Sequence, residues 1–185
     1  DRGSRGRVTA HDALTGRKLW TVWTAPGPGD PGYETWAGRG TWPPMGAAPW
    51  NTISYDPELK LIYFGPGQPT PWSSAVRGGG DALYSNTVLA VDTATGKIRW
   101  HYQMVPGDNW DRAVFESMLV DLDIKGKRRK ALIVTSKIGW GVVLDRTTGE
   151  SFHAFRTAYD NTITGWTEKG RPIINPASIP KAEDI

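Results

Sequence analysis

Apolar residues recur along the chain in short runs, and each run is followed by polar residues typical of turns. The runs lie at residues 53–55, 61–64, 87–91, 118–122, 131–135 and 140–144. Apolar residues in runs of this length, bounded by turn signals, indicate strands with a buried face. No window of ten or more residues follows the 3.6-residue period of an amphipathic helix. The pattern therefore predicts an all-β chain built from short strands.

One strand–turn–strand unit is repeated. Residues 10–20 and 90–100 both read A-x-D-x-x-T-G-[KR]-x-x-W, and residues 143–153 form a weaker copy. In such a unit the Asp side chain caps the turn, and the Gly takes the left-handed backbone conformation. The final Trp is large enough to reach a neighbouring sheet. The aspartates are 80 and 53 positions apart, which suggests propeller blades of 40 to 50 residues with one insertion.

This spacing divides residues 1–185, taken as a single propeller segment, into parts. Residues 7–23 are predicted to form half a blade, and residues 50–103 and 113–156 one blade each. Residues 24–49 are expected to form a long insertion loop, and residues 161–185 an irregular tail. Propellers close with four to eight blades, so we expect these two and a half blades, roughly, to belong to a longer chain or a split propeller. The rest of that propeller is then the first expected partner.

Composition narrows the possible functions. The chain has ten Trp and no Cys, which excludes disulfides, thiolate nucleophiles and Cys-ligated metals. Five basic residues between 125 and 130 lie in an expected hairpin, and such a cluster favours a solvated turn over nucleic-acid binding. No apolar run reaches the length of a membrane-spanning helix, so no membrane span is expected. The three histidines show no spacing that indicates a metal site.

Three groups of motifs together resemble one family. The first is RGRVTAHD at residues 5–12; the second is WNTISYDPEL at 50–59 with YFGPGQ at 63–68; the third is YQMVPGDNWD at 102–111, followed by KIGW at 137–140 and LDRTTG at 144–149. In this order the motifs resemble the pyrroloquinoline quinone (PQQ)-dependent alcohol dehydrogenases of the methanol and ethanol dehydrogenase type. The resemblance covers residues 2–175. It implies an eight-bladed propeller, with PQQ on its axis over a metal ion, that oxidises an alcohol to a carbonyl in the periplasm and reduces a cytochrome c.

The resemblance also implies roles for individual residues. Asp111 falls on the catalytic base, which also lies beside the metal. Trp50 falls on the Trp that stacks on the quinone ring, and Lys137 on the basic residue that bonds the quinone oxygens. Gln68 and Asp1 fall on two metal ligands that are Asn and Glu in the family. Taken alone, Asp111 can equally cap a turn, Trp50 can be a core residue, and Lys137 can be an exposed strand-end residue.

Departures from the family pattern keep two other functions open. Ala48 and Ile138 replace a Thr and an Asn that the family carries near PQQ, and Gln68 is one methylene longer than Asn. These changes are compatible with a propeller scaffold that has lost PQQ. The Trp-rich loop at residues 36–50 is compatible with a polysaccharide-binding propeller. Ala113 stands where lanthanide-using members carry an extra Asp, so we expect Ca²⁺ as the metal.

Overall fold

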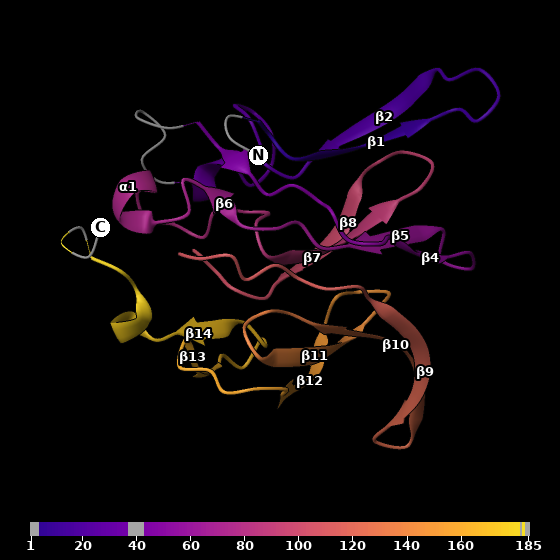
Figure 1. The fold of residues 1–185 in the computed structure, drawn as a ribbon. Coiled ribbons are helices and arrows are strands. Elements are labelled where there is room, and N and C mark those ends of the chain that lie inside the picture. Colours follow the sequence, from indigo (N-terminus) through magenta and orange to yellow (C-terminus); the bar gives the residue numbers. More distant parts are fainter. Residues whose placement is uncertain (1–3, 37–42, 182, 184–185) are drawn as a thin grey trace.

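The computed structural model describes residues 4–36, 43–181 and 183. Its elements are antiparallel strands with one short α-helix and two short 3₁₀ helices (Figure 1). The elements are β1 (Arg7–His11), β2 (Lys18–Trp23), η1 (Tyr33–Thr35), β3 (Met45–Gly46), β4 (Ser54–Asp56), β5 (Leu61–Phe64), β6 (Pro69–Thr70), α1 (Ser74–Arg77), β7 (Thr87–Asp92), β8 (Ile98–Gln103), β9 (Met118–Ile124), β10 (Lys127–Thr135), β11 (Trp140–Asp145), β12 (Ser151–Arg156), β13 (Ile163–Trp166), β14 (Pro172–Ile174) and η2 (Pro176–Ser178). The prediction of an all-β chain is confirmed.

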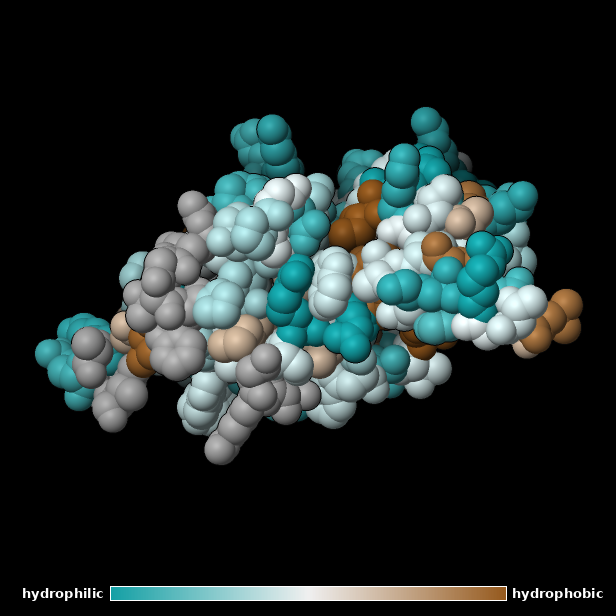
Figure 2. Space-filling model, turned by 90° about the horizontal axis from the view of Figure 1, so that it is seen from above, coloured by the Kyte–Doolittle hydropathy of each residue, from teal (hydrophilic) through white to brown (hydrophobic). Residues whose placement is uncertain are grey.

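Two four-stranded antiparallel sheets form the body of the molecule. Their strand orders are β4-β5-β7-β8 and β12-β11-β10-β9. The second sheet is a meander of consecutive strands, and the first leaves out only β6, which pairs with β3. Figure 1 shows the first sheet between the β1–β2 hairpin and the second sheet. The described residues contain no helix long and apolar enough to cross a membrane. The face in Figure 2 is mostly hydrophilic, and its apolar residues form small separate patches.

The first sheet is buried on both faces, which explains why β7 is apolar at nearly every position. Val88 and Ala90 of β7 belong to a core shared with the second sheet. Leu89 and Val91 belong to a smaller core shared with the β1–β2 hairpin. All four side chains are fully buried. A central strand between two packed layers needs apolar side chains on both faces, because neither face meets water.

The repeated turns join neighbouring blades through their tryptophans. Trp20 Nε1 donates to the carbonyl of Thr93 at 2.9 Å, and Trp100 Nε1 donates to the carbonyl of Arg146 at 3.1 Å. A Cβ atom added to Gly96 would lie 2.7 Å from the Trp20 indole, and one added to Gly149 would lie 2.7 Å from the Trp100 indole. Each Trp therefore lies flush against the glycine turn of the following blade, where no side chain would fit.

Two irregular regions of the sequence contain more structure than expected. The prediction of an irregular tail at residues 161–185 is wrong, because β13 and β14 form a hairpin there. Trp166 of this hairpin packs edge-on against Trp140, with ring centroids 4.5 Å apart, and Tyr102 donates to the carbonyl of Gly170. In the loop at residues 24–49, β3 pairs with β6. These strands have two to four residues, too few for a readable period.

Candidate cofactor site

The candidate site lies where three non-adjacent segments of the chain meet. In the first pairing, the segment before Trp50 runs antiparallel to the segment around Gln68. Ala47 N donates to the carbonyl of Gln68 at 2.7 Å, and Gly67 N donates to the carbonyl of Ala48 at 3.1 Å. Gly67 lies against Trp50, since a Cβ atom there would be 3.0 Å from the indole nitrogen. The backbone therefore holds Trp50 and Gln68 in adjacent segments.

The second pairing brings Asp111 to Lys137. The chain after Asp111 forms a bridge to the end of β10, where Lys137 N donates to the carbonyl of Ala113 at 3.2 Å. The Asn51 side chain donates to the carbonyl of Val114, which ties the Trp50 segment to this pair. Gly65 permits this close approach, because a Cβ atom there would lie 2.5 Å from Cβ of Val114.

Three of the predicted site residues form one polar and aromatic cluster. Lys137 Nζ lies 2.6 Å from Asp111 Oδ2 and 5.1 Å from the centroid of the Trp50 ring. Trp50 is 62% exposed, whereas Trp100 is 8% exposed in the core. Asp111 Oδ1 is buried and has no hydrogen-bond partner. The cluster thus offers an open aromatic face, an ammonium group and a carboxylate oxygen without a partner.

The predicted metal ligands are only partly assembled. Gln68 is half-buried, and its main chain is held by Ala47. Asp1 lies outside the described residues. Within those residues, no group of three or more His, Cys, Asp and Glu side chains could hold a metal ion. A cation at Asp111 would therefore need amide oxygens such as that of Gln68, or ligands from other parts of the protein.

Sequence reasoning did not assign a role to Asp108, which is 1% exposed and lies three residues before Asp111. Burial raises the pKa of the Asp108 carboxyl, and the neighbouring Arg112 opposes that rise. Arg112 Nη1 lies 2.6 Å from Asp108 Oδ1, so the arginine is paired with Asp108 and not with Asp111. The signal available in the sequence was the first Asp of the Pro-Gly-Asp-Asn-Trp-Asp run.

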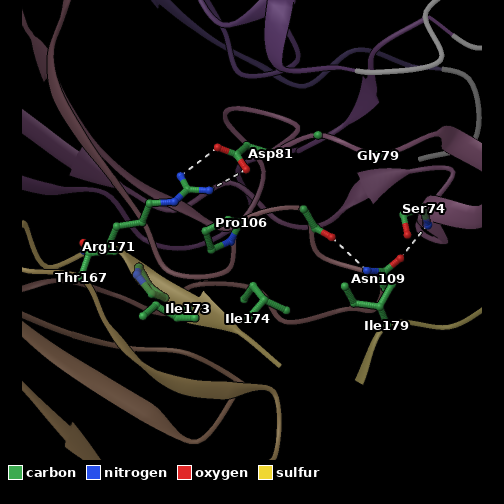
Figure 3. A pocket seen from close by; sticks show the side chains of 13 residues that line it. Ser74, Gly79, Asp81, Pro106, Asn109, Thr167, Arg171, Ile173, Ile174 and Ile179 are labelled. Atoms are coloured by element: carbon green, nitrogen blue, oxygen red, sulfur yellow. Dashed lines mark hydrogen bonds and ion pairs between the residues drawn. The ribbon is translucent and has the colours of Figure 1, made fainter. Parts of the chain in front are cut away.

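Two cavities border the Asp111 loop. One, of about 420 Å³, is lined by Trp72 and Trp110, whose ring centroids are 4.4 Å apart, and by prolines and Val76. The other, of about 400 Å³, lies between this loop and the β13–β14 hairpin (Figure 3). Asp81 and Arg171 are the charged residues that line this cavity, and in Figure 3 they point at each other. They form a bidentate ion pair. The second cavity thus has no unpaired charge for chemistry.

Comparison with known proteins identifies the family. A family model described as the β-propeller domain of glucose/ethanol/alcohol dehydrogenases (PQQ) matches residues 1–159. The chain belongs to this family. The resemblance stated from the motifs is confirmed, and so is the fold class of a partial propeller.

The similar proteins are much longer than this propeller segment. The quinohemoprotein alcohol dehydrogenase ADH IIB of Pseudomonas putida is 42% identical over 94% of this chain, which spans 27% of that protein. The lanthanide-dependent methanol dehydrogenase of Methylacidiphilum fumariolicum is 39% identical, and the chain spans 32% of it. The crystal structure of the Comamonas testosteroni quinohemoprotein alcohol dehydrogenase superposes with a TM-score of 0.86 at 38% identity, over 94% of this chain and 28% of that one.

Proposed function

We propose that this chain forms one wall of the cofactor site in a longer PQQ-dependent enzyme that oxidises an alcohol to its carbonyl. The observation that carries the proposal is the cluster of Trp50, Lys137 and Asp111, which meet from separate segments. An open indole face, a cation and a carboxylate fit a planar quinone that bears negative charge. When bound, PQQ supplies the hydride acceptor for the oxidation.

Each residue of the cluster has a separate role in the proposed reaction. Trp50 offers its exposed ring as a stacking surface, and Lys137 supplies positive charge for the quinone oxygens. Asp111, whose Oδ2 is held by Lys137, is the carboxylate that accepts the hydroxyl proton of the alcohol. The apolar cavity at Trp72 and Trp110 suits the hydrocarbon part of that alcohol.

The test uses the full-length protein with added PQQ and Ca²⁺. We expect the quinone absorbance to appear in the purified protein, and an artificial dye to be reduced when an alcohol is added. A propeller that retains polysaccharide but binds no PQQ would contradict the proposal. Failure to bind either would favour the scaffold reading, which one observation supports: Ile138, the departure from the family Asn, is buried in the core.

We propose Ca²⁺ as the metal, held by Asp111, Gln68 and Asp1. Two of the similar proteins are a lanthanide-dependent methanol dehydrogenase and a europium-containing methanol dehydrogenase, so the choice of metal needs a direct test. Ala113 is uncharged and 1% exposed, and a trivalent ion is better held where more carboxylates converge.

The metal is tested by removing it from the full-length, PQQ-loaded enzyme with a chelator. We expect Ca²⁺ to restore the oxidation of alcohol, and we expect Ala113→Asp to increase the affinity for La³⁺. Restoration of wild-type activity by La³⁺ alone would refute the assignment.

We further propose that the enzyme works in the periplasm and passes its electrons to a cytochrome c. Similar proteins named quinohemoprotein alcohol dehydrogenases, and one named lupanine 17-hydroxylase [cytochrome c], support this choice of acceptor. Reduction of a purified cytochrome c by the full-length enzyme and an alcohol would test the acceptor, and fractionation of the cells would test the compartment.

A further inference from the structure

Asp108 is a buried carboxylate at the centre of the loop that carries Asp111. Its two oxygens accept hydrogen bonds from three main-chain N–H groups of that loop and from two side chains. The main-chain donors belong to Asn109, Trp110 and Arg112, and the side-chain donors to Asn86 and Arg112. The loop is therefore folded around this one carboxylate.

The Asn86 side chain connects Asp108 to the segment of Gln68. Asn86 Nδ2 donates to Asp108 Oδ2 at 2.6 Å, and Asn86 N donates to the carbonyl of Gly67 at 3.0 Å. Asn86 is fully buried, so neither bond competes with water. Since Gly67 directly precedes Gln68, a short chain of buried hydrogen bonds links the segment that carries Gln68 to the loop that carries Asp111.

Arg77 adds a second link between the Asp108 loop and the Gln68 segment. It is 2% exposed and donates to the carbonyl of Asp108 at 3.0 Å, and to the carbonyls of Pro71 and Trp72 at 2.7 and 2.8 Å. Burial lowers the pKa of Arg77 to about 10, and the nearby Asp108 opposes that change. A buried cation of this kind is stable only while its partners stay in place, which makes the arrangement rigid.

We propose that Asp108 is a positioning residue that sets the separation of Asp111 and Gln68, and that it thereby determines the affinity of their site for a cation. The inference rests on the proposed function only in assigning these two residues to the cation. Oxygen donors held at a fixed separation bind a cation more tightly, because the protein loses little freedom when the ion binds.

Asp108 also controls a charge beside the site. Arg112 directly follows Asp111, and its guanidinium group is paired with Asp108. A neutral side chain at position 108 would release this positive charge next to Asp111, where it would oppose a bound cation. Loss of the Asp108 charge is therefore expected to weaken cation binding through geometry and through electrostatics.

The test compares Asp108→Asn with Asp56→Asn in the full-length protein. Asp56 is a matched control: it is 3% exposed, pairs with Arg146 at 2.7 Å, and accepts two main-chain N–H bonds in the turn after β4. Both variants lose a buried charge and leave an arginine without its full partner. Dissociation constants for Ca²⁺ and La³⁺ are measured by calorimetry, and PQQ binding by quenching of tryptophan fluorescence.

We expect Asp108→Asn to weaken cation binding about tenfold, with a smaller effect on PQQ, and Asp56→Asn to change it less than twofold. Equal cation affinities in the two variants would overturn the positioning role while leaving the proposed function intact. A wild-type protein that binds neither cation would remove the metal site itself, and the positioning role with it.

A second variant keeps the test informative if Asp108→Asn does not fold. Asn86→Gly removes only the side-chain link, and glycine accepts the positive φ of 46° at this position. We expect about a threefold weaker affinity for Ca²⁺ in this variant. An unchanged affinity in a folded Asn86→Gly protein would overturn the proposal.

Discussion

At the scale of single residues, exposure separates the tryptophans of the cores from those of the candidate site. Trp36 and Trp100 are almost completely buried, whereas Trp50, Trp72 and Trp110 are 47 to 62% exposed. An exposed aromatic side chain contributes little to the stability of the fold. Several such side chains close together are typical of a ligand-binding surface. These three exposed tryptophans lie beside the loops that carry Asp111 and Gln68.

This difference predicts contrasting effects for two Trp→Ala substitutions in the full-length protein. Trp50→Ala should weaken PQQ binding at least tenfold and change stability little, because its ring is exposed. Trp20→Ala should cost about 3 kcal/mol of stability, because its indole is docked on the next blade, and it should leave PQQ binding nearly unchanged. Fluorescence titration with PQQ and denaturant unfolding measure the two effects. Equal PQQ affinities in the two folded variants would contradict the stacking role of Trp50.

Motifs were sufficient to select Trp50, Lys137 and Asp111 as one group, and the structure brings them together. They were not sufficient to find Asp108 and Asn86. The bond between these residues spans 22 positions and joins two loops. Such a contact depends on how the loops fold back on the sheet, which no local pattern of residue types encodes. Whether Gln68 and Asp1 hold a metal remains a prediction.

At the scale of elements, the glycine turns that contact a tryptophan are sensitive to an added methyl group. Gly149 has a φ of +79°, and a Cβ atom there would lie 2.7 Å from Trp100. Gly126, at the tip of the β9–β10 hairpin, has a similar φ of +75° and no heavy atom within 4 Å of the added Cβ. The two positions share the backbone strain and differ in the neighbouring indole.

We therefore expect Gly149→Ala to destabilise the full-length protein by about 3 kcal/mol, and Gly126→Ala by about 1 kcal/mol. The difference reports the displacement of Trp100 from its docking position. Denaturant midpoints at constant slope measure both values. Equal losses would show that the Trp100 contact adds nothing beyond backbone strain.

The aspartates of the repeated turns predict a dependence of stability on pH. The hydroxyl and main-chain N–H of Thr95 lower the pKa of Asp92, and Thr15 does the same for Asp12. Folding thus favours the ionised form, so the stabilisation is complete above the unfolded pKa near 4 and is lost as the pH falls through the lower folded pKa.

Acid unfolding of Asp92→Asn tests this dependence. We expect the unfolding free energy of the wild-type full-length protein to fall as the pH drops below about 4, and the Asn variant to show a shallower fall. The contribution of Asp108 to stability changes with pH in the opposite direction, because burial raises the pKa of its carboxyl. A variant curve parallel to that of the wild type would exclude Asp92 as a contributor.

Element prediction succeeded where strands were long enough to show a period or were flanked by a repeated turn. Six of the eight strands in the two large sheets overlap apolar runs, and the other two, β8 and β12, each follow a repeated turn. The helix α1 and strands β13 and β14 have only three or four residues, and β3 and β6 have two. Their formation depends on tertiary partners, such as the packing of Trp166 against Trp140.

At the scale of the whole molecule, the chain presents sheet edges to its surroundings. Strand β12 forms an edge of the second sheet, and the β1–β2 hairpin is a two-stranded sheet of its own. We expect the isolated 185-residue segment to fold poorly, because its outermost blades lack packing partners. Thermal unfolding of the purified segment, with its oligomeric state measured by light scattering, checks this. A sharp, cooperative transition of a soluble monomer would contradict the prediction.

Each docked tryptophan contacts the blade that follows it in the chain, so the contacts between blades all run in one direction along the sequence. Trp20 packs on the turn that contains Gly96, and Trp100 packs on the turn that contains Gly149. The environment of each indole therefore depends on the blade that follows it. Local loosening of one blade should therefore change the tryptophan emission of the blade before it. Coupling of this kind resembles that in repeat proteins, where stability passes between nearest neighbours. Loosening of one blade would then destabilise the blade that precedes it, and the effect would spread toward the N-terminus one blade at a time.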